Sequence, residues 1–231
     1  ADVGLAFEDV YLNTSDGVKI NGWFVPSSGA RTTLLWFHGN AGNIGHRVEP
    51  LHRMHDALNA NILMIDYREY GKSEGKVSEE GTYRDAIAAY DYLLTRSDVD
   101  PEHIVLFGQS LGAGVAVELA LKRKAAGLIL EAPFTSIAAM AKAALPWLPI
   151  GGLISTRYDN LSKIARINVP LLILQGDRDE VVPYAQGRKL FEAAKEPKTF
   201  YTIAGAGHND TYLVGGEAYH RALSRFIEGL L

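Results

Sequence analysis

A serine flanked by glycines stands near the middle of the chain, within Gly108-Gln109-Ser110-Leu111-Gly112. The apolar run at residues 104–107 precedes it and is typical of a strand, while the small-residue stretch that follows suits a helix. Glycines in a tight strand-to-helix turn allow close backbone approach and present the central hydroxyl above the sheet. Ser110 is therefore a candidate nucleophile, and a capping serine in a glycine-rich turn is the structural alternative.

A candidate base follows much later in the chain. A serine hydroxyl is a weak nucleophile at neutral pH, so it needs a base within hydrogen-bond reach and a carboxylate that fixes the tautomer of that base. His208 lies in the glycine-rich segment Gly205-Ala206-Gly207-His208, after the last strand-like run. A solvated surface histidine is the alternative, but the order Ser, acid, His is the one that a strand-turn-helix nucleophile requires.

Backbone donors for a developing oxyanion are expected at two places. The N–H of the residue after the nucleophile, Leu111, is one of them. The segment Phe37-His38-Gly39-Asn40 ends an apolar run, and its glycine allows an N–H to face the site, so Asn40 is our candidate for the second. We expect His38 itself to be a structural residue that hydrogen-bonds neighbouring loops.

The elements that must position these residues alternate in type. Alternation at residues 7–12 and 19–25 predicts an antiparallel hairpin. Nearly continuous apolar runs then predict strands buried on both faces, with helix-compatible stretches between them. The strands are expected at 33–37, 61–65, 104–107, 127–130, 169–174 and 200–203, and the helices at about 45–59, 80–97, 111–124, 184–196 and 212–230. This order favours a mostly parallel sheet with an antiparallel N-terminal edge and helices on both faces.

Five segments together resemble the α/β-hydrolase superfamily across nearly the whole chain. They are residues 37–43, 66–73, 108–112, 131–136 and 205–210. The match is closest to the small-lid group that contains the abhydrolase-domain depalmitoylases and their bacterial relatives. The resemblance implies one α/β-hydrolase domain over residues 1–231. One departure is Glu69, where that group usually has glycine, and its position near the expected site mouth bears on substrate preference.

The acid that orients His208 has three candidates, because Glu180 would point away from the imidazole if Asp179 points inward. Asp177 directly follows Gly176 at a strand end and could serve as a loop cap. We expect Glu131 to anchor the lid segment through hydrogen bonds instead. The resemblance places the acid at Asp179, in the pattern Gly-x-x-Asp-x-x-x-Pro that ends at Pro183. The expected set is therefore Ser110, Asp179 and His208.

The segment at about 132–166 is too short for a large cap domain. Its prolines and glycines break it into short pieces, which predicts a helix and a loop at the edge of the site, a minimal lid. Ordinary packing against the sheet is one reading of this segment. The other is an apolar wall for an acyl chain, with Leu145, Trp147 and Leu148 as pocket candidates, or a surface for a membrane or a lipidated protein.

Composition narrows the class of partner. Lys and Arg total 23 against 27 Asp and Glu, a net charge of −4, which disfavours nucleic-acid binding. No apolar run reaches the roughly 18–20 residues of a membrane span, and the absence of cysteine excludes a thiol nucleophile and Cys-ligated zinc. These features leave the location weakly constrained and favour a cytoplasmic protein. Because the chain opens at Ala1 without an initiator methionine, a periplasmic or N-terminally anchored form is the alternative if a leader was removed.

These observations predict a serine hydrolase for short to medium acyl esters. His46, His52 and His55 have no carboxylate at ligand spacing, so we expect neither a metal nor a cofactor. An acyl-protein thioesterase or a serine peptidase would use the same groups, with a small thioester or a lipidated protein as substrate. A non-catalytic binding protein on a hydrolase fold is the rival class.

Overall fold

The N-terminal hairpin forms one edge of the sheet. The computed structural model of the 231-residue chain describes residues 4–144, 147 and 156–231. Strands β1 (Glu8–Asn13) and β2 (Lys19–Val25) pair antiparallel around a turn in which Gly17 has a φ of 79°. β2 then pairs antiparallel with β4 (Asn61–Ile65), the outermost of the parallel strands on this side, so the hairpin edge is as predicted.

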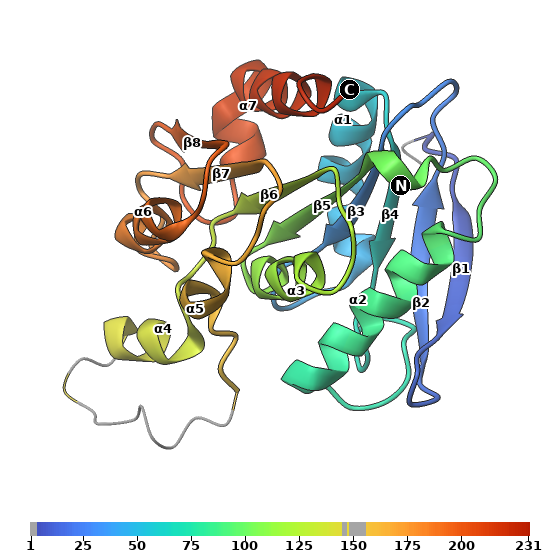
Figure 1. Cartoon of the computed structure of the whole chain (residues 1–231), viewed down its shortest axis with the longest axis horizontal. Coiled ribbons are helices and arrows are strands. Elements are labelled where there is room, and N and C mark those ends of the chain that lie inside the picture. Colours follow the sequence, from blue (N-terminus) through green and yellow to red (C-terminus); the bar gives the residue numbers. More distant parts are fainter. Residues whose placement is uncertain (1–3, 145–146, 148–155) are drawn as a thin grey trace.

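The other six strands run parallel to one another. Every residue of four of them is buried, as the continuous apolar runs predicted. The strand order is β1-β2-β4-β3-β5-β6-β7-β8, with the central strands in the middle of the molecule (Figure 1). Their bounds are β3 Thr33–Phe37, β4 Asn61–Ile65, β5 Ile104–Gln109, β6 Gly127–Glu131, β7 Leu171–Gly176 and β8 Lys198–Ile203.

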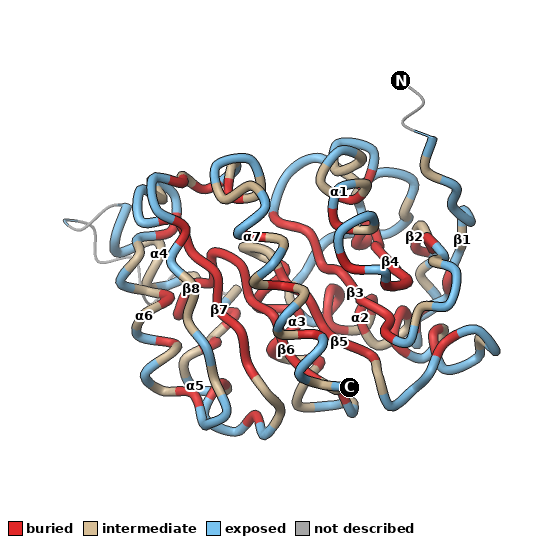
Figure 2. The backbone as a smooth tube through the Cα atoms, turned by 90° about the horizontal axis from the view of Figure 1, so that it is seen from above, coloured by how far each residue is buried: buried red, intermediate tan, exposed pale blue. Residues whose placement is uncertain are grey.

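Helices cover both faces of this sheet (Figure 2). Successive strand residues point to opposite faces, so Leu35 and Phe37 of β3 join one apolar cluster, whereas Leu34 and Trp36 join the other. The first cluster includes residues of α2 (Glu79–Leu93), α3 (Leu111–Ala120) and α6 (Tyr184–Ala193). The second includes residues of α1 (Val48–Leu58) and α7 (Thr211–Glu228). Two short 3₁₀ helices lie between these elements: η1 (Ile44–Arg47) precedes α1, and η2 (Pro101–His103) precedes β5.

The segment predicted to form a minimal lid contains two short helices in its described part. They are α4 (Ile137–Ala144) and α5 (Asn160–Ile164). Residues 145–146 and 148–155 lie outside the described part of the chain. α4 buries none of its residues, in keeping with a position at the rim of the domain (Figure 1). Among the described residues, no helix combines the length and apolar character needed to cross a bilayer.

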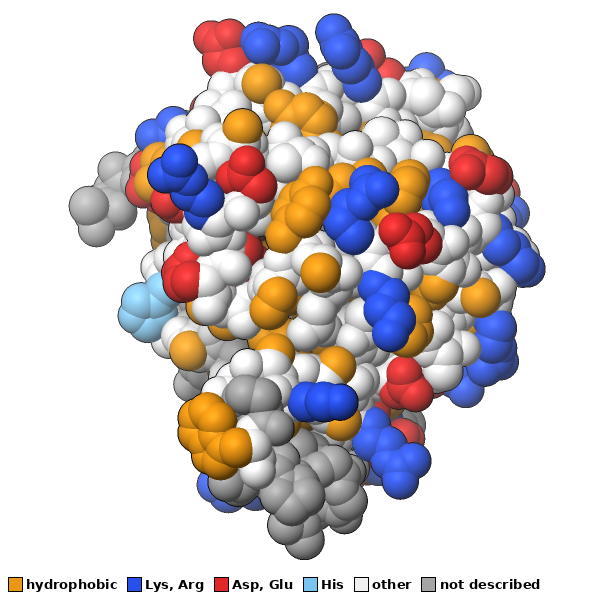
Figure 3. Space-filling view, turned by 90° about the vertical axis from the view of Figure 1, so that its left-hand side faces the viewer, with side chains coloured by type: hydrophobic (Ala, Val, Ile, Leu, Met, Phe, Trp, Pro, Cys, Tyr) orange, Lys and Arg blue, Asp and Glu red, His pale blue; other side chains and the backbone are white. Residues whose placement is uncertain are grey.

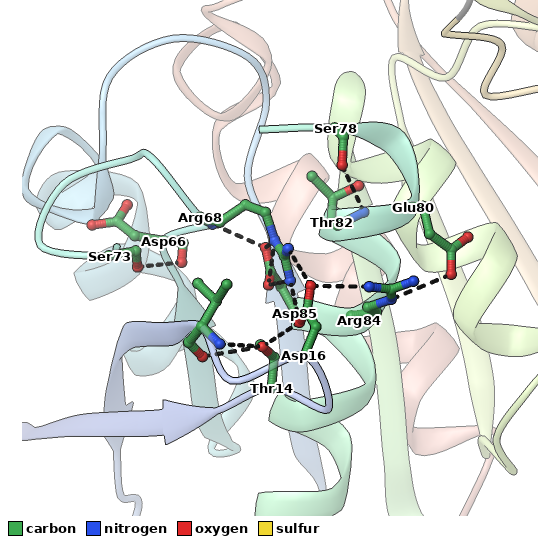
Figure 4. A network of polar contacts seen from close by, with 12 residues as sticks. Thr14, Asp16, Asp66, Arg68, Ser73, Ser78, Glu80, Thr82, Arg84 and Asp85 are labelled. Atoms are coloured by element: carbon green, nitrogen blue, oxygen red, sulfur yellow. Dashed lines mark hydrogen bonds and ion pairs between the residues drawn. The ribbon is translucent and has the colours of Figure 1, made fainter. Parts of the chain in front are cut away.

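A partly buried ion network ties the hairpin to the parallel part of the fold (Figure 4). Arg68, just after β4, contacts Asp16 of the hairpin turn at 2.8 Å and Asp85 of α2 at 2.9 Å. Arg84 reaches the same Asp16 carboxylate at 3.0 Å. The hydrogen bond from Arg68 holds the pKa of Asp16 far below its usual range, while burial raises the pKa of Asp85. Arg68 thereby joins three segments that are distant in sequence.

The surface beside α4 and α6 has no single sign of charge (Figure 3). Basic and acidic side chains are interspersed there with small apolar areas. Such mixing agrees with the small net charge of −4 and offers no continuous cationic track on this face.

Candidate active site

Ser110 occupies the junction between β5 and α3. β5 ends at Gln109 and α3 begins at Leu111, so the serine is the single residue between them. Its φ of 52° and ψ of −113° are values that a residue with a side chain rarely adopts. The Ser110 N–H donates to the Glu131 carbonyl at 2.9 Å, which fixes this strained turn to the end of β6. Strain of this kind persists only where the surroundings impose it.

The two glycines around Ser110 are required by close backbone approach. A Cβ on Gly112 would lie 2.0 Å from the carbonyl oxygen of Phe37 at the end of β3. A Cβ on Gly108 would lie 2.4 Å from the carbonyl oxygen of Gly112. Steric crowding therefore explains both glycines. Without a side chain at Gly112, α3 can start this close to β3, and without one at Gly108 the end of β5 can lie this close to α3.

Ser110, His208 and Asp179 form a continuous chain of hydrogen bonds. His208 Nε2 lies 3.0 Å from Ser110 Oγ, and His208 Nδ1 lies 2.9 Å from Asp179 Oδ2. The Asp179 side chain is fully buried and that of His208 is 10% exposed. Asp179 Oδ1 also accepts the N–H groups of Val181 at 2.9 Å and Val182 at 2.7 Å, which orient the carboxylate. This arrangement can move a proton from the serine hydroxyl to the imidazole and stabilise the resulting imidazolium.

The other two carboxylate candidates have different partners. Asp177 Oδ1 accepts the Gly205 N–H at 2.7 Å, so Asp177 caps the loop that leads to His208. Glu131 accepts hydrogen bonds from Gln109, Thr211 and Tyr219 at 2.9, 2.8 and 2.5 Å. The expectation that Glu131 anchors the lid segment is wrong, because its carboxylate joins the serine turn to the start of α7. Burial raises the pKa of Glu131, and the three donors act in the opposite direction.

The two residues expected to supply oxyanion donors, Asn40 and Leu111, belong to the segments that adjoin Ser110. Leu111 is the first residue of α3, where backbone N–H groups have no acceptor within the helix. The loop after β3 packs directly on the serine, since a Cβ on Gly39 would lie 3.4 Å from Ser110 Cβ. The following residue, Asn40, is held by its side chain, whose Oδ1 accepts the Tyr70 hydroxyl at 2.6 Å.

Buried polar contacts support the loop that carries Asn40. His38 is fully buried, and its Nδ1 lies 2.7 Å from the Gly39 carbonyl oxygen. The Tyr67 hydroxyl donates to the His38 carbonyl at 2.9 Å, and Asp66 Oδ1 accepts the Ile44 N–H at 2.9 Å. These contacts agree with the structural role expected for His38.

Glu69 lies in the loop between β4 and α2, beside Tyr70. Its φ of 71° is in the left-handed region that favours glycine, which explains the glycine of the resembled group at this position. The Glu69 carboxylate contacts Lys76 Nζ at 2.7 Å and accepts the Val77 N–H at 2.8 Å. Glu69 is not among the described lining residues of the cavity beside Ser110. No contact of the described residues therefore supports the expected effect of Glu69 on substrate preference.

A cavity of about 600 Å³ opens beside Ser110. Its lining residues come mainly from β3 and the loop after it, η1, α1, the serine turn, the end of β6, the His208 loop and α7. They include Gly39, Asn40, Ala41, His46, Arg47, Met54, Ser110, His208, Tyr212, Tyr219 and His220. Trp147 is 73% exposed and is not among the described lining residues, while Leu145 and Leu148 lie outside the described residues.

Sequence reasoning missed the residues that α1 and α7 bring to this cavity. Arg47, Met54, Tyr212 and His220 carry no motif, and only their packing around the β3 loop assembles them. The one available signal was that His46 and Arg47 closely follow the glycine-rich loop at 39–42. Within residues 4–144, 147 and 156–231, no group of three or more His, Asp or Glu side chains could hold a metal ion.

Comparisons with known proteins agree on the fold and the family. A model described as the prolyl oligopeptidase family matches residues 67–225. An uncharacterized protein of Mycobacterium tuberculosis strain H37Rv is 41% identical over 224 residues, which cover 96% of this chain and 79% of that protein. The α/β hydrolase domain-containing protein WAV2 of Arabidopsis thaliana is 39% identical over 248 residues, covering 99% and 80%.

The similarity of fold extends to solved structures. The esterase Pf2001 of Pyrococcus furiosus superposes with a TM-score of 0.82 at 22% identity, covering 99% of this chain and 94% of that chain. At this level of identity the likeness concerns the fold, and it confirms the predicted α/β-hydrolase architecture.

Proposed function

The chain belongs to the prolyl oligopeptidase family of α/β hydrolases, and from this premise we propose that it is a serine hydrolase of carboxylic esters. Its substrates would carry short to medium acyl chains. The observation that supports this most is the hydrogen-bond chain from Ser110 through His208 to Asp179, with distances of 3.0 and 2.9 Å.

In the proposed reaction, Ser110 Oγ attacks the acyl carbon while its proton passes to His208 Nε2. The backbone N–H groups of Asn40 and Leu111 stabilise the oxyanion that forms on the acyl oxygen. The tetrahedral intermediate collapses when the ester C–O bond breaks and the leaving alcohol takes the proton from His208. Asp179 acts through His208 as a positioning residue, because it holds the Nδ1 proton and the orientation of the ring.

The second half of the reaction repeats these steps with water. Water gives a proton to His208 Nε2 as its oxygen attacks the acyl-enzyme carbonyl. Collapse then breaks the bond to Ser110 Oγ, which recovers the proton from His208, and the free acid leaves. The same groups would hydrolyse a thioester, or a peptide bond as the name of the matched family suggests.

Exchange of the nucleophile tests the proposal. Ser110→Ala should lower turnover of p-nitrophenyl esters on the order of 10⁶-fold, since the covalent step is lost. Surface Ser224, which donates to Glu228 at 2.8 Å, provides the matched control Ser224→Ala. A fluorophosphonate probe should label the wild type and the control but not Ser110→Ala. Near-wild-type turnover by Ser110→Ala would remove Ser110 from the mechanism, and no labelling of the wild type would favour a binding protein.

The substrate class is determined by comparing kcat/KM across series of esters, thioesters and peptides of matched size. Acyl chains of increasing length should change kcat/KM along the p-nitrophenyl series, because each buried methylene contributes up to about 0.8 kcal/mol. Acyl-thioesters and peptide p-nitroanilides of comparable size complete the panel. Faster turnover of either series than of the best ester would replace the esterase proposal by that alternative.

A further inference from the structure

The described lining of the cavity beside Ser110 holds one permanently cationic side chain and one carboxyl group. Arg47, at the junction of η1 and α1, is the one Arg or Lys among its described lining residues. His46 and His220 also contribute to the wall. The single carboxylate of the described lining is Glu131, which already accepts three hydrogen bonds. The electrostatic character of the cavity therefore follows from Arg47.

The Arg47 guanidinium has unused donors. Its Nη2 donates to the Ala41 carbonyl at 3.2 Å, and its Nε is buried without a hydrogen-bond partner in the described part of the chain. No ion pair joins Arg47 to a carboxylate of the described residues, in contrast to Arg68 and Arg123, which bind Asp85 and Asp91. A guanidinium presents five N–H donors in a planar fork that matches two oxygens of a carboxylate or phosphate.

A second buried donor lies in the same wall. Trp36 is 2% exposed and lines the cavity, and its Nε1 has no acceptor among the described residues. Buried N–H groups in folded proteins are nearly always paired. Arg47 and Trp36 therefore both line the cavity and both carry a buried N–H without an acceptor among the described residues, donors that an anionic ligand could use.

Glu131 does not cancel the positive charge of Arg47. The three donors around Glu131 occupy its oxygens and direct them toward Gln109, Thr211 and Tyr219. Burial also disfavours the ionised form of this carboxyl, because it raises the Glu131 pKa. Glu49, the acidic neighbour of Arg47 on α1, pairs with Arg53 at 2.9 Å.

We propose that the cavity binds a substrate whose acyl part ends in an anionic oxygen group, a carboxylate or a phosphate, and that Arg47 selects it. The inference rests on the proposed ester hydrolysis, because the selected group is defined relative to the bond that Ser110 attacks. A volume of about 600 Å³ is that of a small-molecule site. The anion would accept from the Arg47 fork while the ester carbonyl faces Ser110.

Two esters of equal acyl length measure this selection. Mono-p-nitrophenyl adipate and p-nitrophenyl hexanoate both have six acyl carbons, and only the adipate ends in a carboxylate. The ratio of their kcat/KM values should favour the adipate in the wild type and fall tenfold or more in Arg47→Gln. Arg47→Lys should retain part of the ratio, because it keeps the charge without the planar fork.

A control variant distinguishes the loss of a charge in the cavity from the loss of a charge elsewhere in the protein. Arg123→Gln also removes one positive charge, but Arg123 pairs with Asp91 of α2 on the other face of the sheet. It should leave the ratio of the two esters as in the wild type. An equal loss for both esters in Arg47→Gln would assign Arg47 to holding the Ala41 loop and overturn the proposal. An unchanged ratio would overturn it as well.

Equilibrium binding separates this proposal from the proposed reaction. Calorimetry with Ser110→Ala should detect binding of adipate or of butyl phosphate, and the tighter of the two identifies the anion. The double variant Ser110→Ala, Arg47→Gln should bind that anion at least tenfold more weakly. If the wild type hydrolyses no ester but this dependence on Arg47 holds, the anion site stands and the proposed reaction fails. Binding of neither anion would overturn the site.

Discussion

Replacement of Asp179 by asparagine tests the assignment of the acid most sharply. Asp179 Oδ2 lies 2.9 Å from His208 Nδ1, while Oδ1 accepts two backbone N–H groups, from Val181 and Val182, and lies 3.1 Å from the same ring nitrogen. In Asp179→Asn, the amide oxygen keeps the backbone contacts and the NH₂ group takes the position nearer to His208. That NH₂ group favours the imidazole tautomer with its proton on Nε2, which cannot accept the proton of Ser110.

The magnitude follows from the two orientations of the amide. Rotating the asparagine to restore the correct tautomer would set its NH₂ against two N–H donors, at about 1–3 kcal/mol for each donor left unsatisfied. Remaining in the wrong tautomer lowers kcat on the order of 10⁴ in a serine protease triad, about 5.5 kcal/mol. The expected loss is therefore on the order of 10⁴ in the wrong tautomer, and about 30-fold to 10⁴-fold if the amide rotates and leaves both donors unsatisfied, about 2–6 kcal/mol in total.

Steady-state turnover of a p-nitrophenyl ester measures this loss, with the melting temperature as the check on folding. The matched control is Asp177→Asn, which can still accept the Gly205 N–H. It should change kcat far less, and both variants should melt within about 3 °C of the wild type. A loss below tenfold in folded Asp179→Asn, or a larger loss in Asp177→Asn, would refute the assignment.

Two further predictions concern stability. Gly112→Ala should lower the melting temperature by about 6 °C or more, because its Cβ would lie 2.0 Å from a backbone oxygen of β3. Gly229→Ala, with no atom closer than 3.4 Å, is its control, and equal melting temperatures would contradict the steric argument. Asp16→Asn should destabilise the protein most above the unfolded pKa of about 3.9, since the folded pKa is lower. The difference from the wild type should shrink as the pH falls below 4 in thermal melts, and a constant difference would contradict the role of the Arg68 contact.

The sequence by itself determined the layers of the fold and the serine turn. Apolar runs such as residues 33–37 must be buried on both faces, because no face of such a strand is polar. Glycines two residues before and after Ser110 mark a turn that only small residues allow. The sequence also shows that Ser110 precedes His208, the order that this type of serine turn requires. These features depend on local periodicity and on backbone sterics, which a sequence carries directly.

The tertiary structure decided which groups meet. Asp177 and Asp179 are two residues apart, and only the direction of each side chain brings Asp179 to His208 and Asp177 to Gly205. Glu131 contacts α7 because β6 and α7 pack together, a relation that no local pattern contains.

The cavity depended on tertiary packing in the same way. Its predicted wall lay at residues 145–148, whereas the described lining comes from the β3 loop, η1, α1 and α7. Arg47 and Ser110 both line it although 63 positions separate them in sequence. Cavities form where side chains of distant elements leave space, so their lining depends on how helices pack on the sheet and not on any one segment.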